Sequence, residues 1–538
     1  MSGPRAASSL GIFGDPLDPR ILGSIGDGQS HPLSERFATL AEARVVFPHA
    51  QDLRDEIDWA AIQGAINLAG TGRGGIVRLP PGHFRINRTL LLPACQGAAY
   101  PTALPIVSIA GSGNKVTEIT CDEIGDAFAI SYDRSVASYD QRAHGSRLSD
   151  FMLWGPKSDL GPGAEGDTKT KGLALVDGVE LRNISVMQFD VGIDVQGGQT
   201  AHHRVTADRC RYSLYYSSRN LDHHGDTVWV KCAFVGATQA AIAVSGAAGI
   251  LGTHFDTCLI GYAPYAILKE AYVDYDVVTD NVTFTNCQFE AIGNSLVLEE
   301  GDARRCGMTY TRIANAFIYW HEQQKWPGRP SRATFDLAAF ERSEVRGLSP
   351  IENWQPAAES FFRLDAANGL EVHGADGLVA NCREAGKPLF SAMLDPGSQV
   401  RLVGTAWEGT VRFVDRTSEP VREGDVLEAC WANVRPAGSA SDDVGPAGAG
   451  KGAALSGVAA EAAEPGAPVA VVLRGTARIR TSGRVEREGH PLRLSGMAGA
   501  VEQARPDAGG EASVAPVLGT AVPPIEAGWT TVRLVPLG

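Results

Sequence analysis

Short runs in which apolar and polar residues alternate recur through the middle of the chain. Examples are VWV at 228–230, VTF at 282–284 and CQF at 287–289. An alternation of period two predicts strands that bury one face. The helical spacing of i, i+3, i+4 and i+7 is not sustained here over a dozen positions. Asn, Asp or Gly commonly ends a run, so we expect short strands joined by tight bends.

These runs belong to a repeat. One frame recurs at steps of 23, 22, 26 and 29 residues: an apolar residue, two further residues, Cys or Met, one residue, and a large apolar residue. A nearly constant coil with loops of variable length is typical of a solenoid, and about 22 residues with several short strands suit a parallel β-helix. Successive coils are expected about 4.8 Å apart. The central positions of the frame are Met187, Cys210, Cys232, Cys258 and Cys287.

The nine cysteines of the chain include no CxxC pair and no Cys/His cluster at zinc spacing. We therefore expect no metal site, no cofactor and no complete disulfide framework. The cysteines of the repeat are predicted to be reduced and stacked inside the coils as small apolar groups, although a disulfide between adjacent coils is geometrically conceivable.

One amphipathic helix is predicted ahead of the repeat, near residues 57–70. The segment that follows, 74–93, predicts a strand, a Pro-Gly turn and a second strand. Since the open end of a solenoid exposes unpaired backbone, the helix is expected to cap the first coil. Its apolar face consists of Ile57, Ala61, Ile62, Ala65, Ile66 and Ala69.

A family resemblance covers this opening. GSIGDG (23–28), then DWAAIQGAINLAGTGRGGIVRLPPGHFRINRTLLLP (58–93) and PIVSIAGSGNKVTEI (105–119) occur in that order. The series resembles the start of the pectate-lyase-like right-handed parallel β-helix proteins, which include phage tailspikes. The chain departs from the family in two places. His83-Phe84 stands where a Tyr is usual, and about thirty residues replace the short link after the GDG turn.

Composition divides the rest of the chain. An Ala/Gly/Pro/Ser-rich stretch predicts a flexible linker, and the alternating runs beyond it predict a small β-barrel or sandwich, similar to small β-domains of virion structural proteins. The predicted divisions are an N-terminal arm at 1–50, the β-helix at 51–415, a strand and linker at 416–468, and the small β-domain at 469–538.

The formal net charge of -14 argues against nucleic acid as a partner, because phosphate binding needs a basic surface. No apolar run of about 18 residues is present, so membrane insertion is not expected. The first residues lack the pattern of a secretory signal, and we expect synthesis in the cytoplasm.

Three carboxyl groups are candidates for catalysis. In the predicted register Asp208 and Asp256 lie two coils apart, about 10 Å, which is near the separation used by inverting glycoside hydrolases. Glu290 is three residues after Cys287, with Asp190 as its equivalent four coils away, so a partner would have to come from a loop. The loop candidates are Asp274, Asp276 and Asp280. The alternative for all of these residues is an ordinary polar position at a strand end or bend.

Two histidine pairs lie 21 residues apart, about one coil, and are predicted to stack. With neighbouring carboxylates and aromatic residues they form the candidate glycan-binding surface, and structural roles are the alternative. A calcium-dependent lyase would need a basic pair on adjacent coils, for which Arg209 and Lys231 are the only candidates. The glycan-contact candidates are His202, His203, Asp222, His223, His224, Asp226, Tyr262, Tyr265, Trp320 and Trp326.

The resemblance implies a protein on the surface of a particle. We expect a head or tail spike or fibre of a phage or phage-like particle, such as a gene transfer agent, that binds bacterial capsular or surface polysaccharide. Expected partners are this glycan, two further copies in a homotrimer, and other structural proteins of the particle. A polysaccharide depolymerase, either a hydrolase or a lyase, is the alternative. A purely structural β-helix is the third possibility.

Overall fold

The structure of the chain is a computed structural model. It comprises two compact units, Met1–Cys306 with Tyr319–Arg329 and Gly307–Ile318 with Pro330–Gly538, and each is described by itself. The structure describes residues 16–71, 74–93, 106–122, 124, 128–132, 145–156, 170–217, 226–245, 249–270, 279–300, 307–320, 333–347, 360–366, 368–373 and, for the backbone alone, the strands from residue 399 onward.

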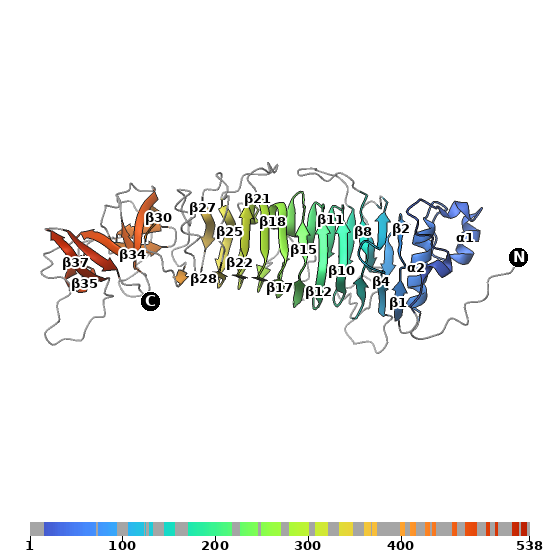
Figure 1. Ribbon diagram of the computed structural model, residues 1–538, viewed down its shortest axis with the longest axis horizontal. Coiled ribbons are helices and arrows are strands. Elements are labelled where there is room, and N and C mark those ends of the chain that lie inside the picture. The colour runs from blue at the N-terminus through green and yellow to red at the C-terminus, as the bar shows by residue number, and fades with distance from the viewer. Residues whose placement is uncertain are drawn as a thin grey trace. The chain divides into compact units, whose positions relative to one another are not determined.

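The first unit begins with helical segments ahead of the first coil (Figure 1). The predicted helix is α2 (Ile57–Ala69), whose apolar face is buried. A further helix, α1 (Leu40–Val46), was not predicted, because its residues carry no apolar stripe and Val45 is 83% exposed. The 3-10 helices are η1 (Pro19–Leu22) and η2 (Leu33–Glu35).

A buried carboxylate fastens the GDG turn to α2. Asp58 accepts hydrogen bonds from Ser24 Oγ at 2.9 Å and from the backbone N–H groups of Ile25 at 2.6 Å, Gly26 at 3.2 Å and Arg85 at 3.1 Å. The turn, the helix and the second strand are thereby held together, which explains why these sequence motifs occur as a set.

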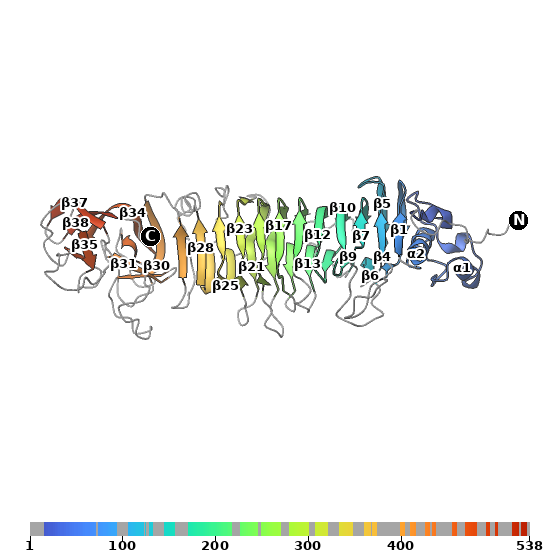
Figure 2. The same ribbon diagram turned by 90° about the horizontal axis from the view of Figure 1, so that it is seen from below.

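Three parallel ladders of strands form the coils of the first unit (Figure 2). In ladder A, each strand pairs with the strand one coil later. Its members are β1 (Gly74–Arg78), β4 (Ile106–Ala110), β7 (Arg147–Ser149), the first half of β10 (Glu180–Met187), the first half of β12 (Ala201–Asp208), β14 (Thr227–Val230), β17 (Thr253–Asp256) and β20 (Thr283–Thr285), which follows the two-residue β19 (Thr279–Asp280).

Ladders B and C follow ladder A in every coil. Ladder B contains β2 (Gly82–Ile86), β5 (Thr117–Cys121), β8 (Met152–Trp154), the second halves of β10 and β12, β15 (Ala233–Val235) and the first parts of β18 (Leu259–Lys269) and β21 (Gln288–Glu299). Ladder C contains β3 (Leu90–Leu92), β6 (Phe128–Tyr132), β9 (Lys171–Leu175), β11 (Val191–Val195), β13 (Tyr212–Tyr216), β16 (Ala240–Val244) and the remaining parts of β18 and β21. These ladders confirm the predicted parallel β-helix with its capping helix.

Two left-handed bends turn the chain in each of the later coils. The first bend separates ladder A from ladder B, and the second separates ladder B from ladder C. The residue at each bend has a positive φ, a conformation that Asn and Gly adopt readily, but Asp, Thr, Tyr, Ala and long polar residues occupy these places as well. The first-bend residues are Asp150, Asn183, Arg204, Lys231, Thr257 and Asn286, and the second-bend residues are Gln188, Arg209, Gly236, Tyr262 and Ala291.

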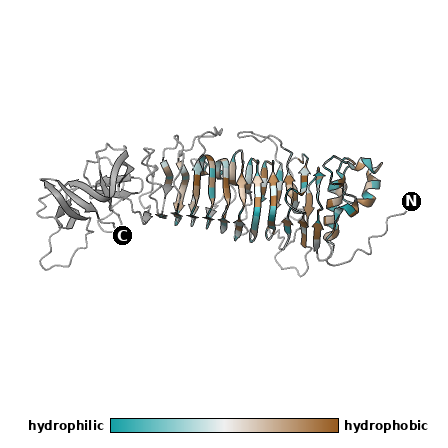
Figure 3. Ribbon diagram, in the orientation of Figure 1, coloured by the Kyte–Doolittle hydropathy of each residue, from teal (hydrophilic) through white to brown (hydrophobic). Residues whose placement is uncertain are grey.

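An aromatic column fills the interior behind ladder A. His202, Trp229, Phe255 and Phe284 are partners on four successive coils. The rings of His202 and Trp229 are stacked at 4.0 Å and those of Phe255 and Phe284 at 4.9 Å. All four side chains are buried. Figure 3 shows the corresponding alternation of hydrophobic and hydrophilic residues along the strands.

The second unit contains parallel strands followed by a separate sheet. The parallel strands are β22 (Met308–Thr309), β23 (Arg312–Ala314), β25 (Ala333–Glu341), β26 (Glu344–Arg346), β27 (Ser360–Ala366), β28 (Asn368–His373) and β29 (Gln399–Val403). A further strand, β24 (Phe317–Trp320), has residues in both units. The nine-stranded sheet is mostly antiparallel and consists of β30 (Gly409–Asp415), β31 (Val426–Cys430), β32 (Asn433–Pro436), β33 (Leu455–Ala459), β34 (Pro468–Arg480), β35 (Pro491–Leu494), β36 (Val501–Gln503), β37 (Gly519–Glu526) and β38 (Trp529–Leu534).

The nine-stranded sheet begins earlier in the chain than the predicted start of the small β-domain. β30 pairs antiparallel with β34, so the sheet begins at Gly409 rather than at residue 469. β33 lies inside the segment predicted as a linker and pairs with β31 and β34. Composition missed β33 because this five-residue strand is flanked by Ala, Gly and Pro.

Candidate functional site

The register of the coils differs from the predicted one at two steps, because Met187 is the partner of Asp208 rather than of Cys210, and Cys210 is not the equivalent of Cys232. His202 is the partner of Trp229, and Ala207 is the partner of Phe234. The residue equivalent to Cys232 is therefore Val205, which follows the first bend, whereas Cys210 follows the second. The prediction that Met187 and Cys210 share the cysteine stack is wrong. Met187 ends a ladder B strand just before the second bend, whereas Cys210 follows that bend, where a buried residue gives the same local pattern as at the first bend.

Three of the cysteines do stack as predicted. Cys232, Cys258 and Cys287 each follow the first bend of successive coils and are buried. The thiol of Cys258 donates to the carbonyl of Trp229 at 3.3 Å, and that of Cys287 donates to the carbonyl of Phe255 at 3.4 Å. Each bond reaches back by one coil. The five cysteines whose side chains the structure describes are free thiols.

The corrected register separates Asp208 from Asp256. Asp208 ends a ladder B strand and is the partner of Met187 and Val235. Asp256 ends a ladder A strand and is the partner of Val230. They belong to different ladders, so the predicted pair of carboxyls two coils apart on one ladder is wrong. The catalytic role of each residue stays a prediction.

Glu290 shares a column with Asp208, and the predicted equivalence with Asp190 is wrong. Gly261 is the partner of Glu290, and the register continues from Phe234 and Ile260 to Val235 and Gly261. We call Met187, Asp208, Val235, Gly261 and Glu290 the ladder B column. Asp208 and Glu290 are three coils apart in it, about 14 Å. That distance exceeds the separation in both retaining and inverting glycosidases.

Tyr262 forms a pair with Glu290 at the second bend. Its hydroxyl donates to Glu290 Oε1 at 2.7 Å, and its side chain is 36% exposed. The hydrogen bond to the carboxylate raises the pKa of Tyr262 to about 12. Gly261, one coil before Glu290, leaves no room for a side chain, since a Cβ there would lie 1.8 Å from the Glu290 carbonyl oxygen. An aromatic ring and a carboxylate therefore stand together on the outside of ladder B.

Asp208 lies in a tighter setting. A Cβ on Gly236 would lie 2.1 Å from Asp208 Oδ1, so the carboxylate occupies the space that this glycine leaves open. Burial raises the pKa of Asp208, and Arg209, at 4.0 Å, partly opposes the change. A carboxyl with a raised pKa is suited to donating a proton.

Strand pairing gives His202 a coil neighbour other than the predicted histidine, and His223 and His224 lie outside the described residues. The coil neighbour of His202 is Trp229, 27 residues later, so an offset of 21 does not match one coil. His202 is 1% exposed, and its Nδ1 accepts a hydrogen bond from Leu181 N–H at 3.2 Å. As folded, it has no surface for a glycan. His203, by contrast, is exposed.

The remaining predicted contact residues divide into three groups. Tyr265 is 6% exposed and packs in an apolar cluster with Tyr212 and Leu268, so it presents little surface. Asp226 is exposed just before β14. The side chain of Trp320, at the end of β24, and the whole of Asp222, His223, His224, Trp326, Asp274 and Asp276 lie outside the described residues.

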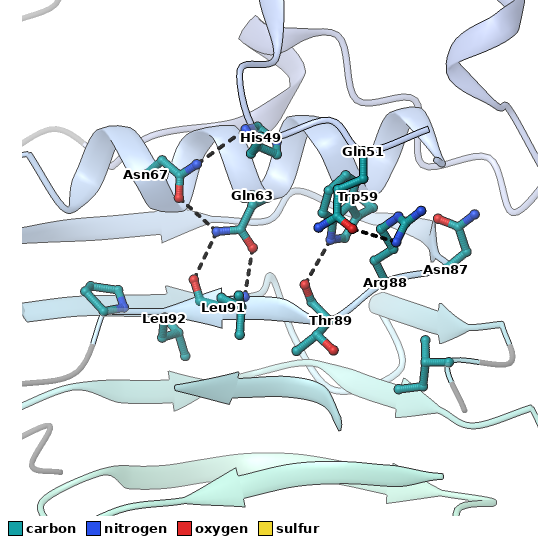
Figure 4. Close-up of a pocket in the computed structure, with 12 residues that line it drawn as sticks. His49, Gln51, Trp59, Gln63, Asn67, Asn87, Arg88, Thr89, Leu91 and Leu92 are labelled. Carbon is teal, nitrogen blue, oxygen red and sulfur yellow. Dashed lines mark hydrogen bonds between the residues drawn. The ribbon is translucent and has the colours of Figure 1, made fainter. Parts of the chain in front are cut away.

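A cavity of about 540 Å³ lies between α2 and β3 (Figure 4). Its polar groups are used within the protein: Gln63 bonds to both the N–H and the carbonyl of Leu91, at 2.7 and 3.0 Å, and Trp59 Nε1 donates to the Thr89 carbonyl at 3.0 Å. These bonds fasten the cap to the first coil, so we assign the cavity a structural role. It contains none of the predicted site residues.

Over the described ranges, no group of three or more His, Cys, Asp or Glu side chains is placed to hold a metal ion. No helix in those ranges is long and apolar enough to cross a membrane.

The coil architecture defines the chain as a parallel β-helix protein. No protein-family model and no curated protein sequence matches it. Among solved structures, it resembles ORF18 of Geobacillus virus E2, with 12% identity and a TM-score of 0.41 over 91% of this chain and 86% of that one. It also resembles the tailspike protein gp49 from Pseudomonas phage LKA1, with 13% identity and a TM-score of 0.35 over 85% and 96%. The A-module of the Azotobacter vinelandii mannuronan C-5 epimerase AlgE4 has 13% identity and a TM-score of 0.35 over 72% and 98%. Identities this low concern the fold alone.

Proposed function

We propose that the protein is a spike or fibre subunit of a phage or phage-like particle and binds bacterial capsular or surface polysaccharide on the outside of ladder B. A β-helix presents equivalent side chains at every coil, which suits an extended polymer. The opening motifs of the sequence support the same assignment. The proposal includes association of the chain into a homotrimer and with other proteins of the particle. It covers a position on the head as well as one on the tail.

The observation that carries the proposal is the pair formed by Tyr262 and Glu290. The exposed face of an aromatic ring packs against the apolar face of a sugar, while a carboxylate accepts hydrogen bonds from sugar hydroxyls. Here the two groups are already joined at 2.7 Å, so little side-chain freedom is lost when a glycan binds.

A binding experiment tests this site. The full chain would be titrated against immobilised capsular polysaccharides and lipopolysaccharide O-chains from a panel of bacteria. We expect at least one polymer to bind and Tyr262→Ala to weaken its binding about tenfold, as for an aromatic anchor. Tyr310→Ala is the matched control, because Tyr310 is also an exposed tyrosine, at 47%, but lies in the second unit. Failure of every polymer to bind, or equal binding by Tyr262→Ala, would reject the proposal.

The particle itself supplies a second test. Phage-like particles from the producing cells would be purified by density gradient and their proteins identified by mass spectrometry. The chain is expected to sediment with capsid and tail proteins, and cross-linking is expected to trap a trimer. A chain found only outside the particle fractions contradicts the spike assignment.

A depolymerase is the second candidate, and Asp208 favours it. Its raised pKa suits a general acid, although Glu290 is too distant to be its partner. Incubation with the bound polysaccharide should then release reducing ends or unsaturated sugars, and Asp208→Asn should abolish the release without abolishing binding. If the polymer is still intact after prolonged incubation, the depolymerase function is rejected and only the binding function remains.

A further inference from the structure

Three exposed cations follow one edge of ladder B. Arg182 is the last ladder A residue of its coil, and Arg204 and Lys231 occupy the first bend of the next two coils. None of the three forms a salt bridge with any residue that the structure describes. We call Arg182, Arg204 and Lys231 the basic ridge. Its presence on a chain with a net charge of -14 is a local departure from the overall charge.

The register places these cations on three successive coils, with Arg204 and Lys231 at equivalent positions and Arg182 one residue before the equivalent Asn183. Arg182 is the partner of His203, and His203 is the partner of Val230, the residue before Lys231. The ridge therefore spans two coil steps, about 10 Å. This corrects the predicted basic pair: Arg204, not Arg209, is the neighbour of Lys231.

Nearby carboxylates are engaged elsewhere. Glu180 is bound by Arg147 at 2.6 Å, Asp150 accepts a hydrogen bond from Asn183 at 2.9 Å, and Asp208 faces Arg209. On the next coil Asp256 is the partner of Val230, the residue before Lys231, and Thr257 donates to it at 3.3 Å. Hence the positive charge of the ridge is not neutralised by a bonded carboxylate.

We propose that the basic ridge binds anionic groups, carboxylate or phosphate, carried at regular intervals along the glycan. This inference rests on the proposed function and names the class of polymer. Three cations at coil spacing match a polymer that carries a charge on each repeat, because attraction between exposed charges adds along the chain. Thr206 and Ala233 follow the ridge on ladder B. Their side chains are short, so a glycan can extend over them from the ridge to the ladder B column.

Since the protein itself supplies the positive charge, the ridge needs no bridging divalent cation. Its binding should weaken as salt screens the charges and should be unchanged by EDTA. These two responses distinguish direct ion pairing from calcium-bridged binding, in which carboxylates on both partners share a metal ion.

The test compares three probes: polygalacturonate for carboxylate, polyribitol-phosphate teichoic acid for phosphate, and dextran as a neutral polymer. Binding to the full chain would be measured by biolayer interferometry at 20, 150 and 500 mM NaCl. The test variant is Arg204→Gln/Lys231→Gln. The control is Arg36→Gln/Arg54→Gln, which makes the same change in net charge at two exposed positions outside the coils.

We expect one anionic polymer to bind more tightly than dextran, with salt-dependent affinity. The test variant should lose about 2- to 30-fold in affinity, as removal of two exposed ion pairs implies, and the control should match the wild type. Equal binding of the test variant, preference for dextran, or loss of binding in EDTA overturns the inference. If the chain binds a neutral polysaccharide of the bacterial panel but no anionic polymer, the inference fails and the proposed function stands. If it binds nothing, both fail.

Discussion

Acidification is expected to destabilise the middle coils through His202. The ring is buried against Trp229, and its Nδ1 accepts the Leu181 N–H, so the neutral form carries its proton on Nε2. Burial, reinforced by His203, lowers the pKa of His202 from 6.5 to about 3. As the pH falls, His202 is therefore protonated in the unfolded chain at a pH where the same side chain is still neutral in the folded protein.

The direction and the size of the change in stability follow from this difference in pKa between the folded and the unfolded chain. Because the unfolded state binds the proton first, the free energy of unfolding falls as pH drops below 6.5 and continues to fall until about pH 3. Each pH unit below 6.5 lowers the free energy of unfolding by about 1.4 kcal/mol, so the loss of stability between pH 7 and pH 4 is about 3 kcal/mol. His202→Phe removes this loss and keeps a ring against Trp229. It leaves the Leu181 N–H without an acceptor, at a cost of about 1–3 kcal/mol at every pH.

The two stability curves should therefore converge or cross. Urea unfolding at pH 7, 5 and 4 would be followed by circular dichroism, and hydrogen exchange of peptides from β10, β12 and β14 would report the local effect. We expect the wild type to be more stable at pH 7 and to lose its advantage by pH 4. If both proteins lose the same free energy between pH 7 and pH 4, His202 is not the acid-sensitive group and the reasoning is refuted.

Three further predictions concern the cap, the bends and the thiols. Asp58→Asn should lower the free energy of unfolding by about 1.5–3 kcal/mol and speed amide exchange at Ile25 and Gly26, since it weakens four hydrogen bonds to a buried carboxylate; unchanged exchange contradicts this role. Thr257→Asn should stabilise the protein by about 1 kcal/mol in urea unfolding, because Thr257 has a φ of 54° and Asn tolerates that conformation better than a β-branched residue; a loss of stability counts against strain at this bend. Cys258 should resist iodoacetamide until the chain unfolds, because the neighbouring Cys232 thiol and burial raise its pKa to about 12. Peptide mapping checks this, and alkylation in the native state would show that the stack opens.

Much of the fold could be predicted from local pattern. Period-two alternation fixed the strands, and the spacing of Cys232, Cys258 and Cys287 gave the coil, because a coil of a β-helix must return to the same interior position. The site was less predictable. Tyr262 and Glu290 were both identified as candidates, but nothing in their spacing of 28 residues indicated a hydrogen bond between them. Arg182 and Arg204 were missed because exposed cations leave no periodic signal.

The sequence by itself determined that short parallel strands wind into coils behind a capping helix, since each strand's burial pattern depends on its own residues. Only the tertiary structure decided the register, because the first and second bends look alike locally and long-range pairing selects between them. That choice moved Asp208 away from Asp256, placed it in a column with Glu290, enclosed His202 against Trp229, and set Arg204 beside Lys231. Which side chains share a surface is a property of strand pairing, and pairing is settled by the packing of whole coils.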